Sequence, residues 1–388
     1  MTTVESRKTV NVAVIGTGFM GKEHAKAWSL APVCCPDILA TPVKKILCDN
    51  DEARVVERAR LWGFEEYTTD YHEILARDDI DIIDICTPAF LHADMAIDAI
   101  RAGKFVFCEK PMVTTMEDGE RLMKVVRECN ANGRTATGFN KRRWPAVQYA
   151  KQLIKEGAIG RVLLYNGRYC QNGVMFRKVN LEHRKWWKTG GFADSGSHIV
   201  DMCRYILDDQ YDSLVARSYP LVDDLPVRAP MEGEDPASIP TAKSECEDFS
   251  LIIANMKSGI TASLYSSSAY AGSGEDISFE IHGTDGGIRW SGANPSVLQI
   301  CEQPLNRASV GFKNILMGPA HPYGNSIPPM PGFGVGVVDQ MSFQVLEVVN
   351  AFVSGQPYNP SFEDAWEIVR VCDKVRQSEK NKEWVKID

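Results

Sequence analysis

The sequence predicts an α/β protein with an N-terminal doubly wound parallel sheet and a C-terminal α/β domain built on a large, open, mainly antiparallel sheet. Short apolar strands alternate with helices over about the first 140 residues, a pattern typical of parallel sheets. Strand patterns with few helices between them follow. With 388 residues, the chain also exceeds what one hydrophobic core usually organises. We place the domain boundary after Asn140, giving domains 1–140 and 141–388.

The first strand runs directly into a glycine-rich turn. Residues 10–15 (VNVAVI) are mostly β-branched, and a G-x-G-x-x-G motif at 16–21 precedes a helical segment that begins at Lys22. Glycines at such a junction let the backbone approach a pyrophosphate at the helix N-terminus. The motif therefore predicts a dinucleotide site of the Rossmann type. The expected contacts are Gly16, Gly18, Phe19, Met20 and Gly21.

An aspartate follows the second strand, residues 43–48, after a Pro-rich insertion at 31–42. Asp49 can accept hydrogen bonds from the adenosine ribose hydroxyls. No arginine follows it directly, so the 2′-phosphate of NADP would meet negative charge there. These features favour NAD over NADP. Alternatively, Asp49 caps the next helix, and both roles can hold at once.

The next strand end carries further candidate cofactor contacts. Residues 81–86 form a strand, and Thr87 and Pro88 follow at its carboxyl end. Thr87 either lines the cofactor crevice or belongs to a simple turn. His92 lies in the helix that follows. We interpret it as a packing or helix-entry residue and keep it among the candidate contacts.

A lysine follows the apolar strand 105–108, within Glu109-Lys110-Pro111. Ligands of open α/β sheets bind at the carboxyl ends of the strands. Pro111 fixes its own backbone and restricts the residue before it, so Lys110 is less free than a loop lysine. Lys110 is therefore a candidate both for catalysis and for contact with the cofactor, and the alternative is an ordinary solvated lysine.

The second half of the chain predicts one broad sheet. An amphipathic helix at 144–156 comes first, and the candidate strands are 161–170, 213–219, 249–255, 260–267, 277–282 and 287–290. Such a sheet needs its outer face covered, and a second copy of the chain is the expected cover. We therefore expect a homo-oligomer, either a dimer or a tetramer. The acidic, Pro-rich segment 221–247 is predicted to be a surface loop.

A second chemical motif lies between these strands. Asp194 and His198 are four residues apart, so they share a face if a helix begins near Ser195, with Ser195 or Ser197 as its cap. They can then serve as a polar pair at the end of a buried helix. The alternative is a capping aspartate and a helix histidine whose hydrogen bonds are satisfied.

Composition excludes several function classes. The net charge is −8, and the longest basic run is only Lys141-Arg142-Arg143, which argues against nucleic acid or an anionic membrane as the main partner. No apolar stretch approaches the ~20 residues of a membrane span, and the polar start is unlike a signal peptide. Eleven scattered cysteines indicate free thiols in the cytoplasm. No Cys/His spacing indicates a metal site.

Taken together, these motifs resemble those of the Gfo/Idh/MocA oxidoreductases, which include inositol, glucose–fructose and glycoside dehydrogenases. The matching positions are the glycine motif at 16–21, Glu109-Lys110-Pro111, Asn140, Gly190-Gly191, Asp194, His198, Asp201 and the C-terminal Pro360-Ser361-Phe362. The resemblance spans nearly the whole chain. The segment 31–42 looks similar to that of the levoglucosan and other glycoside-type dehydrogenases.

The resemblance implies an NAD-dependent enzyme that oxidises a secondary ring hydroxyl of a sugar, polyol or glycoside to a ketone. It implies that Glu109 lies by the nicotinamide ribose and that Asp194 orients the sugar or pairs with Lys110. Lys110 would hydrogen-bond the reacting hydroxyl while His198 takes its proton, which suits a group that titrates near neutrality. The assignment with Lys110 as the base stays open.

The substrate pocket is expected to use hydroxyl-binding amides and aromatic rings. Its candidates are Asn140, Tyr169, Gln171, Trp186 and Trp187; the tryptophans can equally belong to the core or an interface, and Arg184 with Lys185 can instead bind an acidic group. Two other functions remain open. One is a glycoside hydrolase or lyase that uses NAD through a transient keto intermediate, and the other is a non-catalytic NAD-binding regulator.

Overall fold

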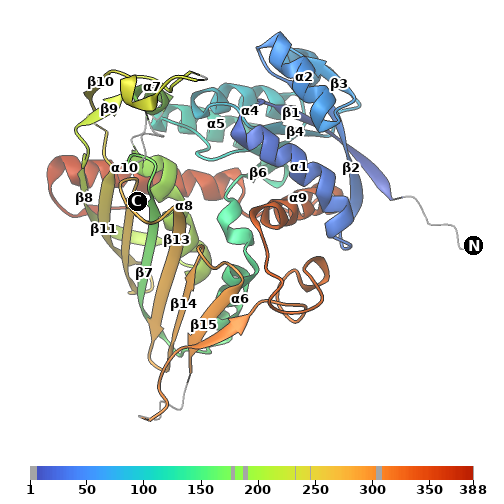
Figure 1. Ribbon diagram of the computed structural model, residues 1–388. Coiled ribbons are helices and arrows are strands. Elements are labelled where there is room, and N and C mark those ends of the chain that lie inside the picture. Colours follow the sequence, from blue (N-terminus) through green and yellow to red (C-terminus); the bar gives the residue numbers. More distant parts are fainter. Residues whose placement is uncertain are drawn as a thin grey trace, which may run out of the picture. The chain divides into compact units, whose positions relative to one another are not determined.

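The computed structural model describes residues 7–175, 180–186, 191–231, 233–244, 246–302 and 308–387 (Figure 1). The chain forms two compact units. The first runs to Arg143 and also takes in Tyr323–Pro328 and Val335–Trp366. The second contains Trp144–Pro322, Pro329–Gly334 and the chain from Glu367 onward. The first unit thus includes C-terminal segments that a division after Asn140 leaves out.

A six-stranded parallel sheet forms the centre of the first unit. Its strands are β1 (Lys8–Ile15), β2 (Ala40–Cys48), β3 (Glu66–Thr68), β4 (Ile82–Ile85), β5 (Phe105–Cys108) and β6 (Thr135–Thr137), in the order β3-β2-β1-β4-β5-β6. This order confirms the predicted doubly wound sheet. Ile15 pairs with Cys48 and Ile85, and Ile85 pairs with Cys108. The four central strands therefore end at one level, and the residues after them share one edge.

Helices pack around this sheet (Figure 1). They are α1 (Phe19–Cys34), α2 (Glu52–Trp62), α3 (Tyr71–Leu75), α4 (His92–Arg101), α5 (Met116–Glu128) and α9 (Val337–Ser354). Short 3-10 helices span Ala89–Leu91, Asn132–Arg134, Asn140–Arg143 and Gly324–Ser326. The segment 31–42 is not a separate insertion, because the last turn of α1 and the start of β2 take up most of it. Pro32 lies inside the last turn of α1, where it cannot donate to the carbonyl four residues earlier.

Helix α9 lies against α1, although more than 300 residues separate them in sequence. The Asn350 Oδ1 accepts a 2.8 Å hydrogen bond from the backbone N–H of Leu39, and the Cys35 thiol lies 3.8 Å from the carbonyl of Ser342. The basic run identified in the sequence is buried here as well. Arg143 pairs with Glu347 of α9 at 2.6 Å. The run is therefore structural and offers no basic surface.

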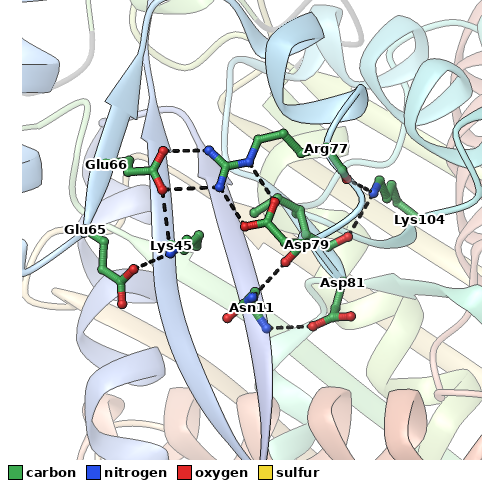
Figure 2. Close-up of polar contacts among 9 residues, drawn as sticks. Asn11, Lys45, Glu65, Glu66, Arg77, Asp79, Asp81 and Lys104 are labelled. Carbon is green, nitrogen blue, oxygen red and sulfur yellow. Dashed lines mark hydrogen bonds and ion pairs between the residues drawn. The ribbon is translucent and has the colours of Figure 1, made fainter.

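A charged network joins the loops at the amino-terminal edge of the same sheet (Figure 2). Its contacts link Lys45 with Glu65 and Glu66, Arg77 with Glu66 and Asp79, Asn11 with Asp81, and Lys104 with the carbonyls of Arg77 and Ile80. Most of these groups are partly exposed, where an ion pair contributes about 0–1 kcal/mol. These side-chain contacts hold together the loops at the amino-terminal edge of the sheet. The candidate ligand-binding residues lie at the opposite, carboxyl-terminal edge.

The second unit contains a nine-stranded sheet. Its strands are β7 (Val162–Gln171), β8 (Tyr211–Tyr219), β11 (Phe249–Met256), β12 (Thr261–Ser267), β13 (Glu275–Gly283), β14 (Gly287–Ser291), β15 (Val297–Cys301), β16 (Lys313–Leu316) and β17 (Val385–Lys386). Among the strands of this sheet that the structure describes, only β7 and β12 pair in parallel, so the predicted mainly antiparallel sheet is confirmed. The segment predicted as a surface loop instead contains a two-stranded ribbon, β9 (Asp224–Pro226) with β10 (Thr241–Lys243), and a 3-10 turn at Pro236–Ser238.

One face of this sheet is covered and the other is open. Helix α8 (Gly191–Leu207) covers β7, β11 and β12, and α6 (Pro145–Lys155) covers β14 and β15. Helix α10 (Phe362–Asn381) lies against β8, and the short α7 (Leu181–Trp186) lies beside the ribbon of β9 and β10 (Figure 1). Alternation along the strands buries Tyr165 and Leu264 and leaves Leu164 and Ile253 exposed by 46% and 43%. In the ranges that the structure describes, no helix combines the length and apolar character needed to cross a membrane.

Candidate active site

The glycine turn leaves no room for side chains at its first and last positions. Gly16 has a φ of +105°, and a Cβ there would lie 2.7 Å from the Cys86 carbonyl oxygen. A Cβ on Gly21 would lie 2.0 Å from the carbonyl oxygen of Gly16. Gly18 faces open space and precedes α1, whose N-terminus has no side-chain cap. The turn therefore suits a pyrophosphate, which would accept hydrogen bonds from these backbone N–H groups.

The other two predicted contacts in the turn open α1. Phe19 is the first residue of α1 and is 76% exposed, while Met20 is partly buried beside it. Both lie next to the open space at Gly18. They can cover the apolar parts of a dinucleotide, and that role stays a prediction.

Asp49 is held by several hydrogen bonds at the end of β2. Its Oδ2 accepts from the Thr17 N–H at 2.9 Å and the Thr17 hydroxyl at 2.5 Å. Its Oδ1 accepts from the Arg54 guanidinium at 2.8 Å. Burial alone would raise the pKa of Asp49, but the bonds from Thr17 and Arg54 lower it below its usual range. Asp49 is thus an oriented carboxylate beside the glycine turn.

The structure corrects two sequence interpretations around Asp49. The N-cap of α2 is Asp51, which accepts from the Arg54 N–H at 3.0 Å, so Asp49 does not cap this helix. Second, the sequence has no arginine directly after Asp49, but the structure places a cation beside it. Arg54, the third residue of α2, forms an ion pair with the Asp49 carboxylate. The negative charge that a 2′-phosphate would meet at Asp49 is therefore partly compensated by Arg54.

Replacing Asp49 with alanine is expected to raise the KM for NAD and to relax discrimination against NADP. Hydrogen bonds to a charged group contribute about 1.5–3 kcal/mol, so the expected rise is about ten- to a hundredfold. Steady-state kinetics with both cofactors measure it. Asp51→Ala is the matched control, because it removes an equal charge two residues away, with the α2 cap and a 3.7 Å ion pair to Arg54, and leaves the Asp49 carboxylate in place. An unchanged cofactor preference in Asp49→Ala would contradict the ribose-binding role.

The ends of β4 and β5 are joined by a buried histidine. Thr87 is partly buried and Pro88 exposed at the end of β4. His92 begins α4 and is only 1% exposed, with Nδ1 2.9 Å from the Pro111 carbonyl and Nε2 2.9 Å from the Thr87 carbonyl. Burial lowers the pKa of His92, so the ring is neutral and donates to one of these carbonyls. Both ring nitrogens face the protein, which places His92 behind the loops that would contact a cofactor.

Glu109 and Lys110 stand at the shared edge of the sheet. The Glu109 N–H donates to the Ile85 carbonyl at 2.9 Å, which holds the end of β5 against β4. Glu109 is buried, and its Oε2 accepts from the Lys110 N–H at 3.1 Å. Lys110 is partly exposed. The structure therefore presents Lys110 beside the cofactor edge while the Glu109 carboxylate points into the protein.

Asn140 also lies in the first unit, in the 3-10 helix after β6. Its side chain is 8% exposed, and its Nδ2 lies 3.2 Å from the Met341 Sδ. Its Oδ1 accepts no hydrogen bond among the described residues. A substrate role for Asn140 stays a prediction.

In the second unit, α8 carries the predicted aspartate and histidine. It begins at Gly191 rather than near Ser195, so Asp194 lies in its first turn and His198 one turn later. Neither Ser195 nor Ser197 caps it, because their hydroxyls lie near the carbonyls of Gly191 and Asp194. The first turn is instead satisfied from a distant loop, where the Glu247 carboxylate accepts from the Phe192 N–H at 3.0 Å.

His198 faces an aromatic and acidic wall formed by β7 and β13. Its ring meets the Tyr169 ring edge-on, with centroids 5.7 Å apart. The Tyr169 hydroxyl donates to Glu275 Oε1 at 3.0 Å. Burial and the nearby charges of Glu275 and Asp194 raise the pKa of Tyr169 well above its ordinary value, opposed by a hydrogen bond with Gln171. The structure thus brings Tyr169, Gln171, Asp194 and His198 together.

Sequence reasoning missed Glu275. This residue begins β13 and pairs with Gln171 of β7 across the sheet. More than 100 residues separate the two strands in sequence, and no local motif marks a carboxylate at the start of a strand. Only the register of the sheet places it beside Tyr169.

The remaining aromatic candidates are the two tryptophans, Trp186 and Trp187. Trp186 is the last residue of α7, and Trp187 lies outside the described residues, as does Gly190. Arg184, considered as a ligand for an acidic group, is buried and paired with Asp248. Its guanidinium also donates to the Cys246 carbonyl at 2.7 Å and to the Ser244 hydroxyl at 3.2 Å. Arg184 therefore anchors the loop that caps α8, and the acidic-ligand alternative is wrong for this residue.

The glycine cradle, the oriented Asp49 and the lysine at the sheet edge define the first unit as a dinucleotide-binding Rossmann unit of the oxidoreductase type. Residues 10–134 match an oxidoreductase family with an NAD-binding Rossmann fold, and residues 147–289 match the GFO/IDH/MocA C-terminal domain. The chain belongs to the GFO/IDH/MocA oxidoreductase family. The resemblance inferred from the motifs and the choice of NAD are thereby confirmed.

Similar proteins extend over most of the chain. Levoglucosan dehydrogenase of Pseudarthrobacter phenanthrenivorans is 31% identical over 389 residues, covering 98% of each protein. Inositol 2-dehydrogenase of Rhizobium meliloti is 30% identical over 294 residues, covering 75% of this chain and 78% of that protein. A solved structure of levoglucosan dehydrogenase with NADH and levoglucosan has a TM-score of 0.90 at 30% identity, covering 98% of this chain and all of that one.

Proposed function

We propose that the protein is an NAD-dependent dehydrogenase that oxidises a secondary ring hydroxyl of a sugar, polyol or glycoside to a ketone. The observation that carries the proposal is the near full-length similarity to levoglucosan dehydrogenase, combined with a lysine at the cofactor edge and an Asp/His pair on α8. A levoglucosan-type anhydrosugar is the first substrate to test. NAD supplies the hydride acceptor for this chemistry.

Removal of the hydroxyl proton falls to the protein's own side chains. His198 is assigned as the general base, because an imidazole exchanges protons near neutral pH. Lys110 is assigned as the hydrogen-bond donor to the reacting oxygen, where an ammonium stabilises the charge that develops as the proton leaves. Asp194, one turn before His198, is assigned to orient the sugar. The reverse assignment of the base, with Lys110 neutral, is separated by experiment below.

The wall around His198 suits a carbohydrate. The Tyr169 ring can pack on an apolar sugar face, and Gln171 and Glu275 offer hydrogen-bonding groups for hydroxyls. Glu275 and Asp194 add negative charge, which disfavours an acidic substrate. We therefore propose a neutral ring substrate rather than a sugar acid.

Formation of NADH with a panel of substrates tests the function. The panel contains levoglucosan, inositols, free hexoses and methyl glycosides, each with NAD, and absorbance of NADH is followed with product analysis. Oxidation to a keto product with one NADH per turnover is expected. Cleavage of a glycoside without net NADH would support the lyase or hydrolase alternative instead. Tight NAD binding with no turnover of any member would support a regulator.

We further propose that copies of the chain associate through the open face of the large sheet. Leu164, Leu251 and Ile253 are exposed there, and a hollow on the sheet is lined by polar groups that include Arg168, Glu280 and Arg289. Sedimentation velocity at micromolar concentration tests this, and a monomer would contradict it. A cytoplasmic location also stays a proposal, supported by eleven free cysteines.

A further inference from the structure

A fully buried histidine bridges two carboxylates beneath the cofactor edge. His24 lies in α1, just after the glycine turn, and is 0% exposed. Its Nδ1 lies 2.9 Å from Asp84 Oδ2, and its Nε2 lies 3.0 Å from Glu109 Oε1. Asp84 belongs to β4 and Glu109 follows β5. The ring therefore spans the two strands whose ends carry Thr87 and Lys110.

The two contacts favour a protonated ring, because both partners are carboxylates. A carboxylate only accepts hydrogen bonds, and a neutral imidazole donates from one nitrogen only. With both nitrogens at hydrogen-bond distance from carboxylates, only an imidazolium donates to both. Burial would lower the pKa of His24, but Asp84 and the neighbouring Cys86 raise it well above the ordinary value. The cation is thus matched by the buried carboxylates that it contacts.

Further packing fixes the His24 ring and argues against a metal in this place. The ring stacks on Phe107 with centroids 5.0 Å apart, and Asp84 also accepts from Trp28 Nε1 at 2.7 Å. His24, Asp84 and Cys86 lie close enough to hold an ion. However, burial raises the pKa of the Cys86 thiol, and its Sγ lies 3.5 Å from Asp84 Oδ1. Hydrogen-bond donors therefore already surround Asp84.

The Glu109 carboxylate transmits this restraint to Lys110. Its Oε1 contacts His24, and its Oε2 accepts from the Lys110 backbone N–H at 3.1 Å. Behind it, a Cβ on Gly138 would lie 2.3 Å from Oε1, so a glycine at this position makes the space for the carboxylate. The chain from His24 to the Lys110 backbone thus consists of two hydrogen bonds through a single buried side chain.

We propose that His24 is a positioning residue that, as an imidazolium, fixes Glu109 and through it the backbone of Lys110. This inference rests on the catalytic role of Lys110 in the proposed function. It assigns the kinetically important contact to Nε2, on the Glu109 side, and a stabilising contact to Nδ1, on the Asp84 side. A misplacement of about 1 Å at a reacting group can cost about 10²-fold in rate.

Two variants, in each of which a side-chain amide replaces one of the two ring nitrogens, separate the contact with Asp84 from the contact with Glu109. In His24→Asn the amide nitrogen takes the place of Nδ1 and keeps the bond to Asp84, whereas in His24→Gln it takes the place of Nε2 and keeps the bond to Glu109. We expect kcat to fall about 10²-fold in His24→Asn and much less in His24→Gln, with little change in the KM for NAD in either. Trp28→Phe is the control, because it removes another donor to Asp84 and should lower stability with kcat retained.

The outcomes distinguish this inference from the proposed function. Equal losses of kcat in His24→Asn and His24→Gln, or a matching loss in Trp28→Phe, would overturn the positioning role. If the histidine variants do not fold, ¹⁵N NMR of the histidine-labelled wild type decides. Both His24 nitrogens should be protonated at about pH 8, where an ordinary histidine is neutral. A neutral ring would overturn the inference, whereas an imidazolium in an enzyme that oxidises no sugar would overturn only the proposed function.

Discussion

Replacing Lys110 with methionine is expected to lower kcat by about 10²–10⁴-fold while leaving the affinity for NAD nearly unchanged. Methionine keeps the length and much of the apolar stem of lysine but has no charge and no hydrogen-bond donor. The loss therefore falls on the transition state, in which negative charge develops on the substrate oxygen. We expect the glycine turn and Asp49 to supply most of the binding of the dinucleotide, so the loss of this ammonium should change that binding little.

The same strand supplies a matched control for Lys110→Met. Lys104 immediately precedes β5, at the opposite edge of the sheet, and its Nζ donates to the Ile80 carbonyl at 3.0 Å (Figure 2). Lys104→Met should lower stability, because it leaves buried carbonyls without their donor, and should leave kcat unchanged. Steady-state kinetics and thermal unfolding of both variants provide the comparison. If Lys110→Met retained more than about a tenth of the wild-type kcat, the assignment of Lys110 would be wrong.

The first unit was predictable because its signals are local. A strand, a glycine turn and a helix follow one another within about 25 residues, and the parallel order of the sheet then brings the residues after each strand to one edge. This rule alone predicted that Asp49 and Lys110 lie at that edge, and the sheet order confirms their placement. The rule cannot show which way each side chain turns, so it did not predict that the Glu109 carboxylate points inward to His24.

The missed features depend on partners distant in sequence. The start of α8 was misplaced because the acceptor for the Phe192 N–H in its first turn is Glu247, more than 50 residues later, rather than a nearby serine. Glu275 reaches Tyr169 only through the register of β13 against β7. In the same way, α9 packs on α1 although more than 300 residues separate them in sequence. A single domain boundary after Asn140 therefore separates two helices that belong to the same unit.

Replacing His198 with asparagine should also lower kcat by about 10²–10⁴-fold, since the variant keeps a polar side chain but cannot accept and hold the proton. The asparagine is smaller than the ring that meets Tyr169, so stability should be measured alongside the kinetics. Tyr169→Phe is the matched control. It keeps the ring against His198 and removes the hydrogen bonds of the hydroxyl with Glu275 and Gln171, so it should change the KM for the substrate more than kcat.

The dependence of kcat on pH identifies the base. If His198 takes the proton, the kcat of the wild type should fall toward acidic pH, because a protonated imidazole cannot accept a proton. The kcat of His198→Asn should then be low and no longer fall at acidic pH. If a neutral Lys110 is the base, the fall at acidic pH persists in His198→Asn and disappears in Lys110→Met. The double variant adds a second criterion. If the two residues act together on the same hydroxyl, the double variant should lose little more of its kcat than either single variant. If the two losses of kcat are instead fully additive in free energy, Lys110 and His198 serve separate steps.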